Sequence, residues 1–236
     1  MILIEEITRQ MKQGQTAPFL CTADDGNQYI VKGARATSKG LVKEWISAHL
    51  CRAFGLPIPD FELAYVDDAL VEYGYDDLGS GMCFASQFVP NIQDIPYAKL
   101  GGVSQKTLRD LYLFDFWIKN DDRCLTELGG NPNLFLDPVS NELIVLDHNL
   151  AFDSSFNLEN HTSLHVGRAA WFATQFELFG QTEYEEQLEN AFEHLAEAVD
   201  SIPDEWLENY SLDSIKQEII VVLEQFRTTN FWEALR

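Results

Sequence analysis

Lys32 and Glu44 form the first pair of residues that could do chemistry. Lys32 ends the apolar run Tyr29-Ile30-Val31-Lys32, and Glu44 follows inside a segment with helical spacing. An ammonium group at the end of a buried strand needs a counter-charge or a phosphate, because desolvating it alone is costly. Glu44 can supply that charge, so the pair indicates a cation held ready for a polyphosphate. The alternative is a surface lysine that extends from a strand edge.

Asn120-Asp121-Asp122-Arg123 is the second chemical segment, at the end of a helix rich in aromatic residues. Two adjacent carboxylates repel each other unless a cation, a substrate proton or an arginine compensates. Such a cluster can act as a general base or bind a metal ion. An ordinary loop that terminates the helix is the alternative interpretation.

Leu146-Asp147-His148-Asn149 is the third segment, and it closes an apolar strand. An aspartate at the end of a buried strand is costly unless it meets a metal ion or hydrogen-bond donors. Asn131 and Asn133 precede the expected partner strand and offer neutral oxygen ligands suited to Mg²⁺. A turn aspartate that caps its own backbone is the alternative.

The elements that must position these residues divide the chain in two. Residues 19–22 and 29–32 have the pattern of a hairpin, 41–50 that of a helix, and 63–66 and 82–89 those of further strands. This first part is predicted to be a sheet with one helix on it. After Pro90, Ser104 caps a helix that ends at Asn120, and strands 133–136 and 143–146 form a hairpin. Helices are expected over 183–199 and 212–226.

Charge limits the partners that this protein can have. Sixteen Lys and Arg residues oppose 38 Asp and Glu, a net charge of −22, and residues 153–236 contribute −13 of it. Such a surface repels nucleic acid and anionic membranes, and it favours basic protein surfaces or cationic ligands. The four cysteines form no CxxC pair, no long apolar run occurs, and we expect no signal peptide because the first residues turn acidic at once. We therefore expect a cytoplasmic protein.

The order of the three segments carries more information than each one alone. Lysine on a strand, glutamate on the next helix, N-D-D-R, asparagine beside a strand and aspartate after its partner match the functional parts of a kinase. Over residues 15–180 the chain resembles the HipA-like kinases, a bacterial family related in layout to phosphatidylinositol 3/4-kinases. The resemblance also includes Gly55-Leu56-Pro57-Ile58-Pro59, Asn131-Pro132-Asn133-Leu134-Phe135 and Leu146-Asp147-His148-Asn149-Leu150-Ala151-Phe152.

This resemblance implies a role for each matching residue. Lys32 would hold the α- and β-phosphates of ATP and pair with Glu44, and Asp122 would orient or deprotonate the acceptor hydroxyl. Asn133 and Asp147 would hold Mg²⁺. Gln87, Phe88 and Val89 fall where a hinge backbone would bind adenine.

The resemblance also implies a fold and an activity. The expected fold is a two-lobed α+β, protein-kinase-like architecture. Its small lobe would span residues 1–89 and its mainly helical large lobe 90–236, with the catalytic segment at 112–152 and an acidic helical region at 153–236. The implied activity is ATP- and Mg²⁺-dependent phosphorylation of Ser or Thr in a protein. Family relatives often act beside a partner protein encoded with them, as toxin–antitoxin pairs do.

Two departures from kinase patterns leave alternatives open. No GxGxxG or GxxxxGK[ST] occurs, so residues 14–18 or 33–40 would have to cover the phosphates. Asp122 lies 11 positions before Asn133, so residues 125–132 look like an insertion and Asn131 could be the metal ligand instead. Other functions considered are a nucleotide-binding pseudokinase or acidic module that binds a basic partner through 183–236, and AMPylation on the same scaffold.

Overall fold

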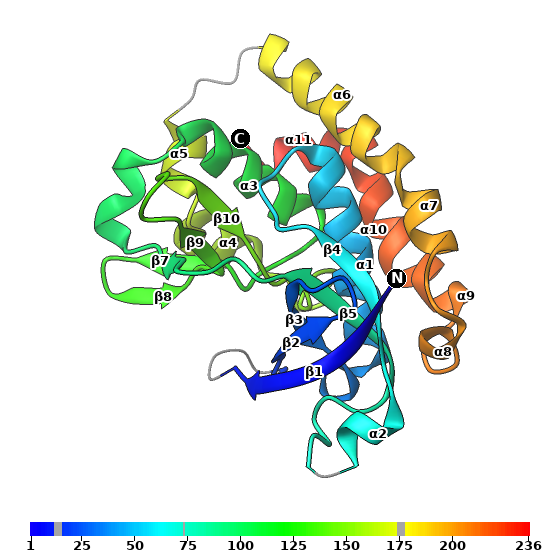
Figure 1. Ribbon diagram of the computed structural model, residues 1–236. Coiled ribbons are helices and arrows are strands. Elements are labelled where there is room, and N and C mark those ends of the chain that lie inside the picture. Colours follow the sequence, from blue (N-terminus) through cyan, green and yellow to red (C-terminus); the bar gives the residue numbers. More distant parts are fainter. Residues whose placement is uncertain (12–15, 73, 174–177) are drawn as a thin grey trace.

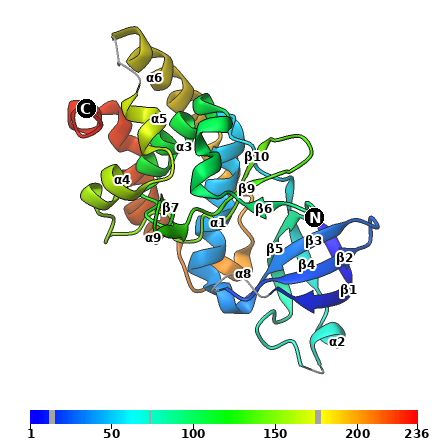
Figure 2. The same ribbon diagram turned by 90° about the vertical axis from the view of Figure 1, so that its left-hand side faces the viewer.

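The computed structural model describes residues 1–11, 16–72, 74–173 and 178–236 (Figure 1). Strands dominate the first part of the chain and helices the second, and the two parts lie side by side (Figure 2). The first part contains β1 (Ile2–Gln10), β2 (Phe19–Ala23), β3 (Gln28–Lys32), the 3-10 helix η1 (Ala34–Ala36), α1 (Thr37–Phe54), β4 (Phe61–Val66), α2 (Asp68–Val71) and β5 (Gly81–Gln87).

The five strands of the first part close into a barrel of order β1-β2-β3-β5-β4. The predicted hairpin is confirmed, with Phe19 opposite Val31 in an antiparallel register. The sequence interpretation missed β1, which pairs with β2 and closes the barrel by running parallel to β4. Two register shifts between β1 and β2 interrupt the alternation of buried and exposed residues that would have marked this strand.

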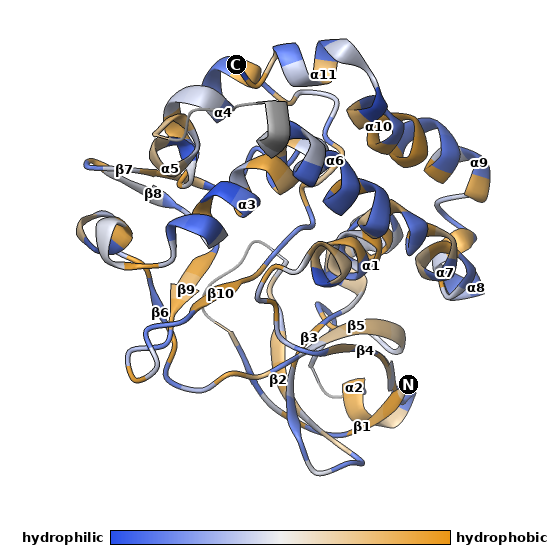
Figure 3. Cartoon of the chain, turned by 90° about the horizontal axis from the view of Figure 1, so that it is seen from above, coloured by the Kyte–Doolittle hydropathy of each residue, from blue (hydrophilic) through white to orange (hydrophobic). Residues whose placement is uncertain are grey.

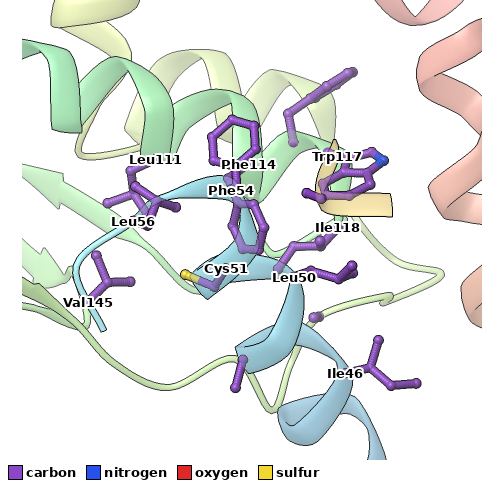
Figure 4. Packing of buried hydrophobic residues seen from close by; sticks show 14 of the residues in the cluster. Ile46, Leu50, Cys51, Phe54, Leu56, Leu111, Phe114, Trp117, Ile118 and Val145 are labelled. Carbon is purple, nitrogen blue, oxygen red and sulfur yellow. The ribbon is translucent and has the colours of Figure 1, made fainter. Parts of the chain in front are cut away.

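Helix α1 lies between the barrel and the helical part. It ends at Gly55, which has a φ of 88° and donates a hydrogen bond from its amide to the Arg52 carbonyl, forming a left-handed cap. Nearly all sides of α1 are buried, as expected for a helix between two layers. Figure 4 shows Phe54 of α1 against Phe114 of the helical part, with ring centroids 5.5 Å apart.

The second part begins with β6 (Gln93–Asp94), the 3-10 helix η2 (Tyr97–Gly102) and α3 (Gln105–Trp117), followed by β7 (Cys124–Thr126), β8 (Gly129–Asn131), β9 (Leu134–Leu136) and β10 (Leu143–Val145). Ser104 caps α3 as predicted, accepting a hydrogen bond from the Thr107 amide. However, α3 ends at Trp117 rather than Asn120. The hairpin of β9 and β10 is confirmed, and the expected insertion forms a separate hairpin of β7 and β8.

The C-terminal region consists of one longer helix, α6 (Leu178–Glu193), and a series of short ones: α4 (Leu158–Leu164), α5 (Arg168–Phe172), α7 (Leu195–Asp200), α8 (Asp204–Leu207), α9 (Leu212–Ile215), the π-helix η3 (Lys216–Ile220), α10 (Val221–Leu223), the 3-10 helix η4 (Glu224–Arg227) and α11 (Thr229–Glu233). The helix expected over 183–199 divides at His194, whose amide bonds to the Ala191 carbonyl in a tight turn. Figure 3 shows hydrophilic and hydrophobic residues mixed along α6, α9 and α10. Among the described residues, none of the helices has the length and apolar character needed to cross a membrane.

Candidate functional site

Lys32 connects three elements where the barrel, α1 and the β9–β10 hairpin meet. Its Nζ lies 3.0 Å from Glu44 Oε2 and 2.9 Å from Asp147 Oδ1. Burial favours the neutral amine, but the carboxylates of Asp147 and Glu44 outweigh it and raise the pKa of Lys32. Burial also raises the pKa of Glu44, whereas Lys32 holds that of Asp147 below its usual value. One ammonium group therefore serves two carboxylates, and the cluster can accept a further cation.

Asn133 directly precedes β9 and Asp147 follows shortly after β10, and both have a positive backbone φ. Their φ angles are 42° and 61°, in the left-handed region that costs most residues free energy but suits Asn and Asp. The buried guanidinium of Arg123 holds both segments in place. Its Nη1 donates to the carbonyls of Asn133 at 2.6 Å and Leu146 at 3.1 Å, and its Nη2 donates to that of Asp147 at 3.4 Å.

Arg123 is itself fixed by Asp115 of α3. Arg123 Nε donates to Asp115 Oδ2 at 2.6 Å, and His165 Nε2 donates to the same oxygen at 2.8 Å. The Gly167 amide donates to His165 Nδ1, so the proton of that neutral imidazole is on Nε2. Burial alone would raise the pKa of Asp115, but Arg123 and His165 hold it well below its usual range.

The first and last residues of the N-D-D-R segment have a structural role, because both bind Asp115. Asn120 Nδ2 donates to Asp115 Oδ1 at 2.9 Å, and Arg123 binds the other oxygen. Sequence reasoning missed Asp115 and His165 as parts of this arrangement. A signal was present at Asp115, because a carboxylate on the apolar face of a helix must be paired.

Asp122 faces the asparagines that sequence reasoning placed near the metal site. Its Oδ2 accepts from Asn133 Nδ2 at 3.0 Å, and Asn131 Nδ2 lies 3.4 Å from each of its oxygens. Burial raises the pKa of Asp122, and the two asparagine donors oppose that effect. A partly buried carboxylate with a raised pKa accepts a proton more readily than an ordinary aspartate does.

Two cavities meet at this site. The inner cavity, of about 330 Å³, lies between the barrel and the hairpin and is lined by Lys32, Glu44 and mostly apolar side chains. The outer cavity, of about 640 Å³, is lined by Asp122 and Asn131. Asn133, Phe135 and Asp147 line both cavities, so these three residues mark the junction.

The segment 87–89, interpreted as the hinge, lines the inner cavity. The Gln87 and Phe88 amides donate to the carbonyls of Asp60 and Gln28, at 2.7 and 2.8 Å. The Val89 amide bonds to none of the described residues. The Val89 amide and the carbonyls of this segment are therefore the backbone groups that an adenine base could use.

The donor set at the junction fits Mg²⁺. Asn133 uses Nδ2 on Asp122, which leaves Oδ1 as an acceptor, and Asp147 Oδ2 bonds to no described residue. Mg²⁺ takes one or two such protein oxygens together with phosphate oxygens and water. The described ranges contain no group of three or more His, Cys, Asp and Glu side chains that could hold a metal ion.

The structure describes the two segments suggested to cover the phosphates to different extents. Gly14 and Gln15 lie outside the described residues. Residues 33–40 form η1 and the first turn of α1, and the amides of Ala34 and Arg35 bond to the carbonyls of Leu78 and Asp77. The assignment of the phosphate-covering element stays a prediction.

Comparison with known proteins identifies the family. The family model described as HipA-like kinase matches residues 4–235. None of the curated proteins matches the sequence. Among solved structures, the proinflammatory kinase CtkA of Helicobacter pylori is similar, with a TM-score of 0.57 and 11% identity, covering 98% of this chain and 94% of CtkA. A choline/ethanolamine kinase family protein from Mesorhizobium loti has a TM-score of 0.34 at 9% identity, covering 96% and 90%.

The similarity to CtkA shows the fold, because it extends over nearly the whole of both chains. It confirms the prediction of a protein-kinase-like fold, in which a β-rich N-terminal sheet precedes a mostly helical region. The family model extends over almost every residue, including all three segments from which sequence reasoning started. The chain belongs to the HipA-like kinase family.

Proposed function

We propose that this protein transfers the γ-phosphoryl group of ATP, with Mg²⁺, to a Ser or Thr hydroxyl of a protein. One observation carries the proposal: Lys32 lines the inner cavity and is held between Glu44 and Asp147, and Asp147 lies at the junction with the outer cavity, in the arrangement that phosphoryl transfer needs. Family membership supports the use of ATP.

Lys32 would act on the nucleotide. Its ammonium is already desolvated and held by Glu44, so it can donate to the α- and β-phosphates with little reorganisation. The apolar wall of the inner cavity, which includes Ile30, Phe84 and Val145, suits the face of an adenine ring.

Asp147 and Asn133 would hold the metal ion through Oδ2 and Oδ1. When bound, Mg²⁺ neutralises charge on the β- and γ-phosphates. Because Arg123 fixes the backbone of both residues, these oxygens are placed before the ligand arrives.

Asp122 would act on the acceptor. It lines only the outer cavity, so a hydroxyl that reaches it meets the γ-phosphate at the junction. The carboxylate orients the hydroxyl and receives its proton as the new oxygen–phosphorus bond forms.

A thermal-shift titration with intact-mass analysis tests the proposal. The wild type, Asp147→Asn and the remote, exposed control Asp200→Asn are measured with ATP plus Mg²⁺ and with ATP plus EDTA. At 100 times Kd, binding adds about 2.7 kcal/mol of apparent stability. We expect a metal-dependent shift in the wild type and control that is lost in Asp147→Asn, and phosphate on the protein or on added Ser/Thr peptides.

The alternatives give different results in the same experiment. Nucleotide binding without any transfer would identify a pseudokinase. A nucleotide mass on the acceptor, instead of a phosphate mass, would identify AMPylation. No shift under any condition would refute the proposal.

A further inference from the structure

The outer cavity has the position of an acceptor site. Among the described residues it shares only Asn133, Phe135 and Asp147 with the inner cavity, and it is lined by Asp122, which does not line the inner cavity. A hydroxyl group that attacks a phosphoryl group at the junction must approach roughly in line with the bond that breaks. In the proposed reaction the nucleotide occupies the inner side of the junction, so the acceptor would enter from the outer side.

The charged groups in the outer cavity have one sign. All are carboxylates: Asp94 of β6, Asp122, Glu127 between β7 and β8, and Asp147. No Lys, Arg or His is among the described residues that line it. By contrast, the inner cavity contains Lys32. Asp94 and Glu127 are exposed and lie on elements other than those of Asp122 and Asp147, so they can meet groups that flank the acceptor.

The rim of this cavity also offers backbone groups to an extended chain. Within the described part of the protein, β8 pairs only with β7, so its other edge is open. The edge begins with Gly129 and Gly130, which lack side chains that would cover it. At Gly130 a Cβ would lie 2.2 Å from the Cys124 carbonyl oxygen, so glycine there permits the close approach of the paired strand β7. An extended peptide can add to an open edge of this kind.

Apolar side chains lie on the same rim. Tyr97 and Leu150 line the cavity and are 37% and 41% exposed, so they can contact the side chains of a bound segment. Carboxylates around the reacting position, an open strand edge and exposed apolar contacts together favour a peptide over a small alcohol.

From these features we infer that the acceptor is a Ser or Thr in an extended segment of a partner protein, with Lys or Arg on both sides of it. The inference rests on the proposed function, since it assigns the acceptor of that reaction. The acceptor oxygen forms a bond to the γ-phosphorus of ATP, the bond from that phosphorus to the bridging oxygen breaks, ADP leaves, and the proton passes to Asp122.

Three short peptides with a central Ser and flanking Arg, Ala or Glu residues test this inference. Phosphorylation with ATP and Mg²⁺ is measured as kcat/KM, and binding of fluorescein-labelled copies is measured by anisotropy at several salt concentrations. Asp94→Asn, Glu127→Gln and the double variant are compared with Glu186→Gln, which removes an exposed charge on α6.

We expect the Arg-flanked peptide to be preferred and the preference to weaken with salt. The double variant should lower the preference about fivefold, as expected for two partly exposed ion pairs, and each single variant should lower it less. Glu186→Gln should keep the preference of the wild type.

The remaining outcomes separate this inference from the proposed function. Equal transfer to all three peptides, or transfer to choline but to none of them, would overturn the inference and leave phosphotransfer standing. Binding of the Arg-flanked peptide that weakens in the double variant, without any transfer, would keep the cationic-peptide surface and refute the kinase activity. No selective binding by the wild type would overturn the inference directly.

Discussion

Two clusters of charged residues lie close together in this protein and differ in what they bond to. The cleft cluster consists of Lys32, Glu44 and Asp147 and is joined by the two ion pairs of Lys32, while backbone amides reach it only at 3.4 and 3.5 Å. The buried cluster consists of Asp115, Arg123 and His165. Its Arg123 also donates hydrogen bonds to four backbone carbonyls, those of Pro132, Asn133, Leu146 and Asp147.

The difference separates positioning from ligand binding. The side chains of Asp115 and Arg123 are 0% exposed, and Arg123 has its donors on protein oxygens. The Asp147 side chain is 23% exposed and keeps an oxygen free of described partners at the junction of the two cavities. A charged cluster that is satisfied by backbone fixes geometry, whereas a cluster with unused atoms facing a cavity can bind a ligand.

Removing Arg123 should have the largest effect. Arg123→Met leaves Asp115 buried without its cation and releases the carbonyls beside Asn133 and Asp147. Loss of one partner of a buried ion pair costs about 3–5 kcal/mol of the free energy of unfolding. Urea denaturation should show this loss. Arg35→Met, which removes an exposed pair with Asp77, is the control and should change stability little. Equal losses in the two variants would contradict the assigned role.

Asp122→Asn should have the next largest effect, on turnover rather than on stability. The variant keeps the shape of the side chain but removes the proton acceptor, so kcat should fall about 10²–10⁴-fold. Asp121→Asn is a matched control, because Asp121 is the adjacent carboxylate and lines neither cavity. Single-turnover phosphorylation assays distinguish the two. Similar losses in both variants would indicate that the segment acts through its fold and not through Asp122.

Acid should destabilise the protein through its buried histidines. Burial lowers the pKa of His148 to about 3, and burial also lowers those of His161 and His165. The unfolded chain gains protons below a pH of about 6.5 while the folded chain stays neutral, so stability is full above that pH and falls as the pH decreases. For His148 the loss should be about 1.4 kcal/mol per pH unit and should continue down to about pH 3.

Denaturation between pH 7 and pH 5 measures this slope. His148→Phe keeps an aromatic ring beside Phe114 and should remove one histidine's share of the pH dependence. His194→Phe changes an exposed histidine and serves as the control for the substitution itself. An unchanged slope in His148→Phe would show that its proton uptake does not differ between the folded and unfolded states.

The features that depend on residues close together in the sequence could be predicted. The β2–β3 and β9–β10 hairpins and the Ser104 cap follow from short-range patterns, and all three are confirmed. Lys32 and Glu44 could be paired because a buried ammonium needs a carboxylate. Contacts between distant segments were harder, since no local pattern shows that Lys32 also meets Asp147 or that β1 closes a barrel with β4.

The buried cluster was missed for the same physical reason. Asp115, Arg123 and His165 come from α3, the loop after it and the loop before α5, and burial is what makes them a unit. Buried charges must be paired, but the sequence alone does not show which residues are buried together. No local pattern therefore connects His165 with Asp115.

The smallest effect is expected for a substitution of Asn131. Comparing it with a substitution of Asn133 tests which asparagine holds the metal ion. Asn133 has two roles: its carbonyl accepts a hydrogen bond from Arg123 of the buried cluster, and its side chain donates to Asp122. Asn131 is exposed and contacts Asp122 only at 3.4 Å. Asn131→Ala should change the Mg²⁺ concentration needed for half-maximal ATP protection less than about threefold, whereas Asn133→Ala should raise it about tenfold or more.

Asn133→Asp tests whether the oxygen ligand is what matters at that position. Aspartate tolerates the left-handed backbone and retains an oxygen for the metal ion, but it cannot donate to Asp122. The variant should therefore bind Mg²⁺ better than Asn133→Ala while turning over slowly, because the added charge faces Asp122. If Asn131→Ala instead raised the Mg²⁺ requirement more than Asn133→Ala, the hairpin of β7 and β8 would supply the ligand. The fixed backbone of the buried cluster would then orient Asp147 alone.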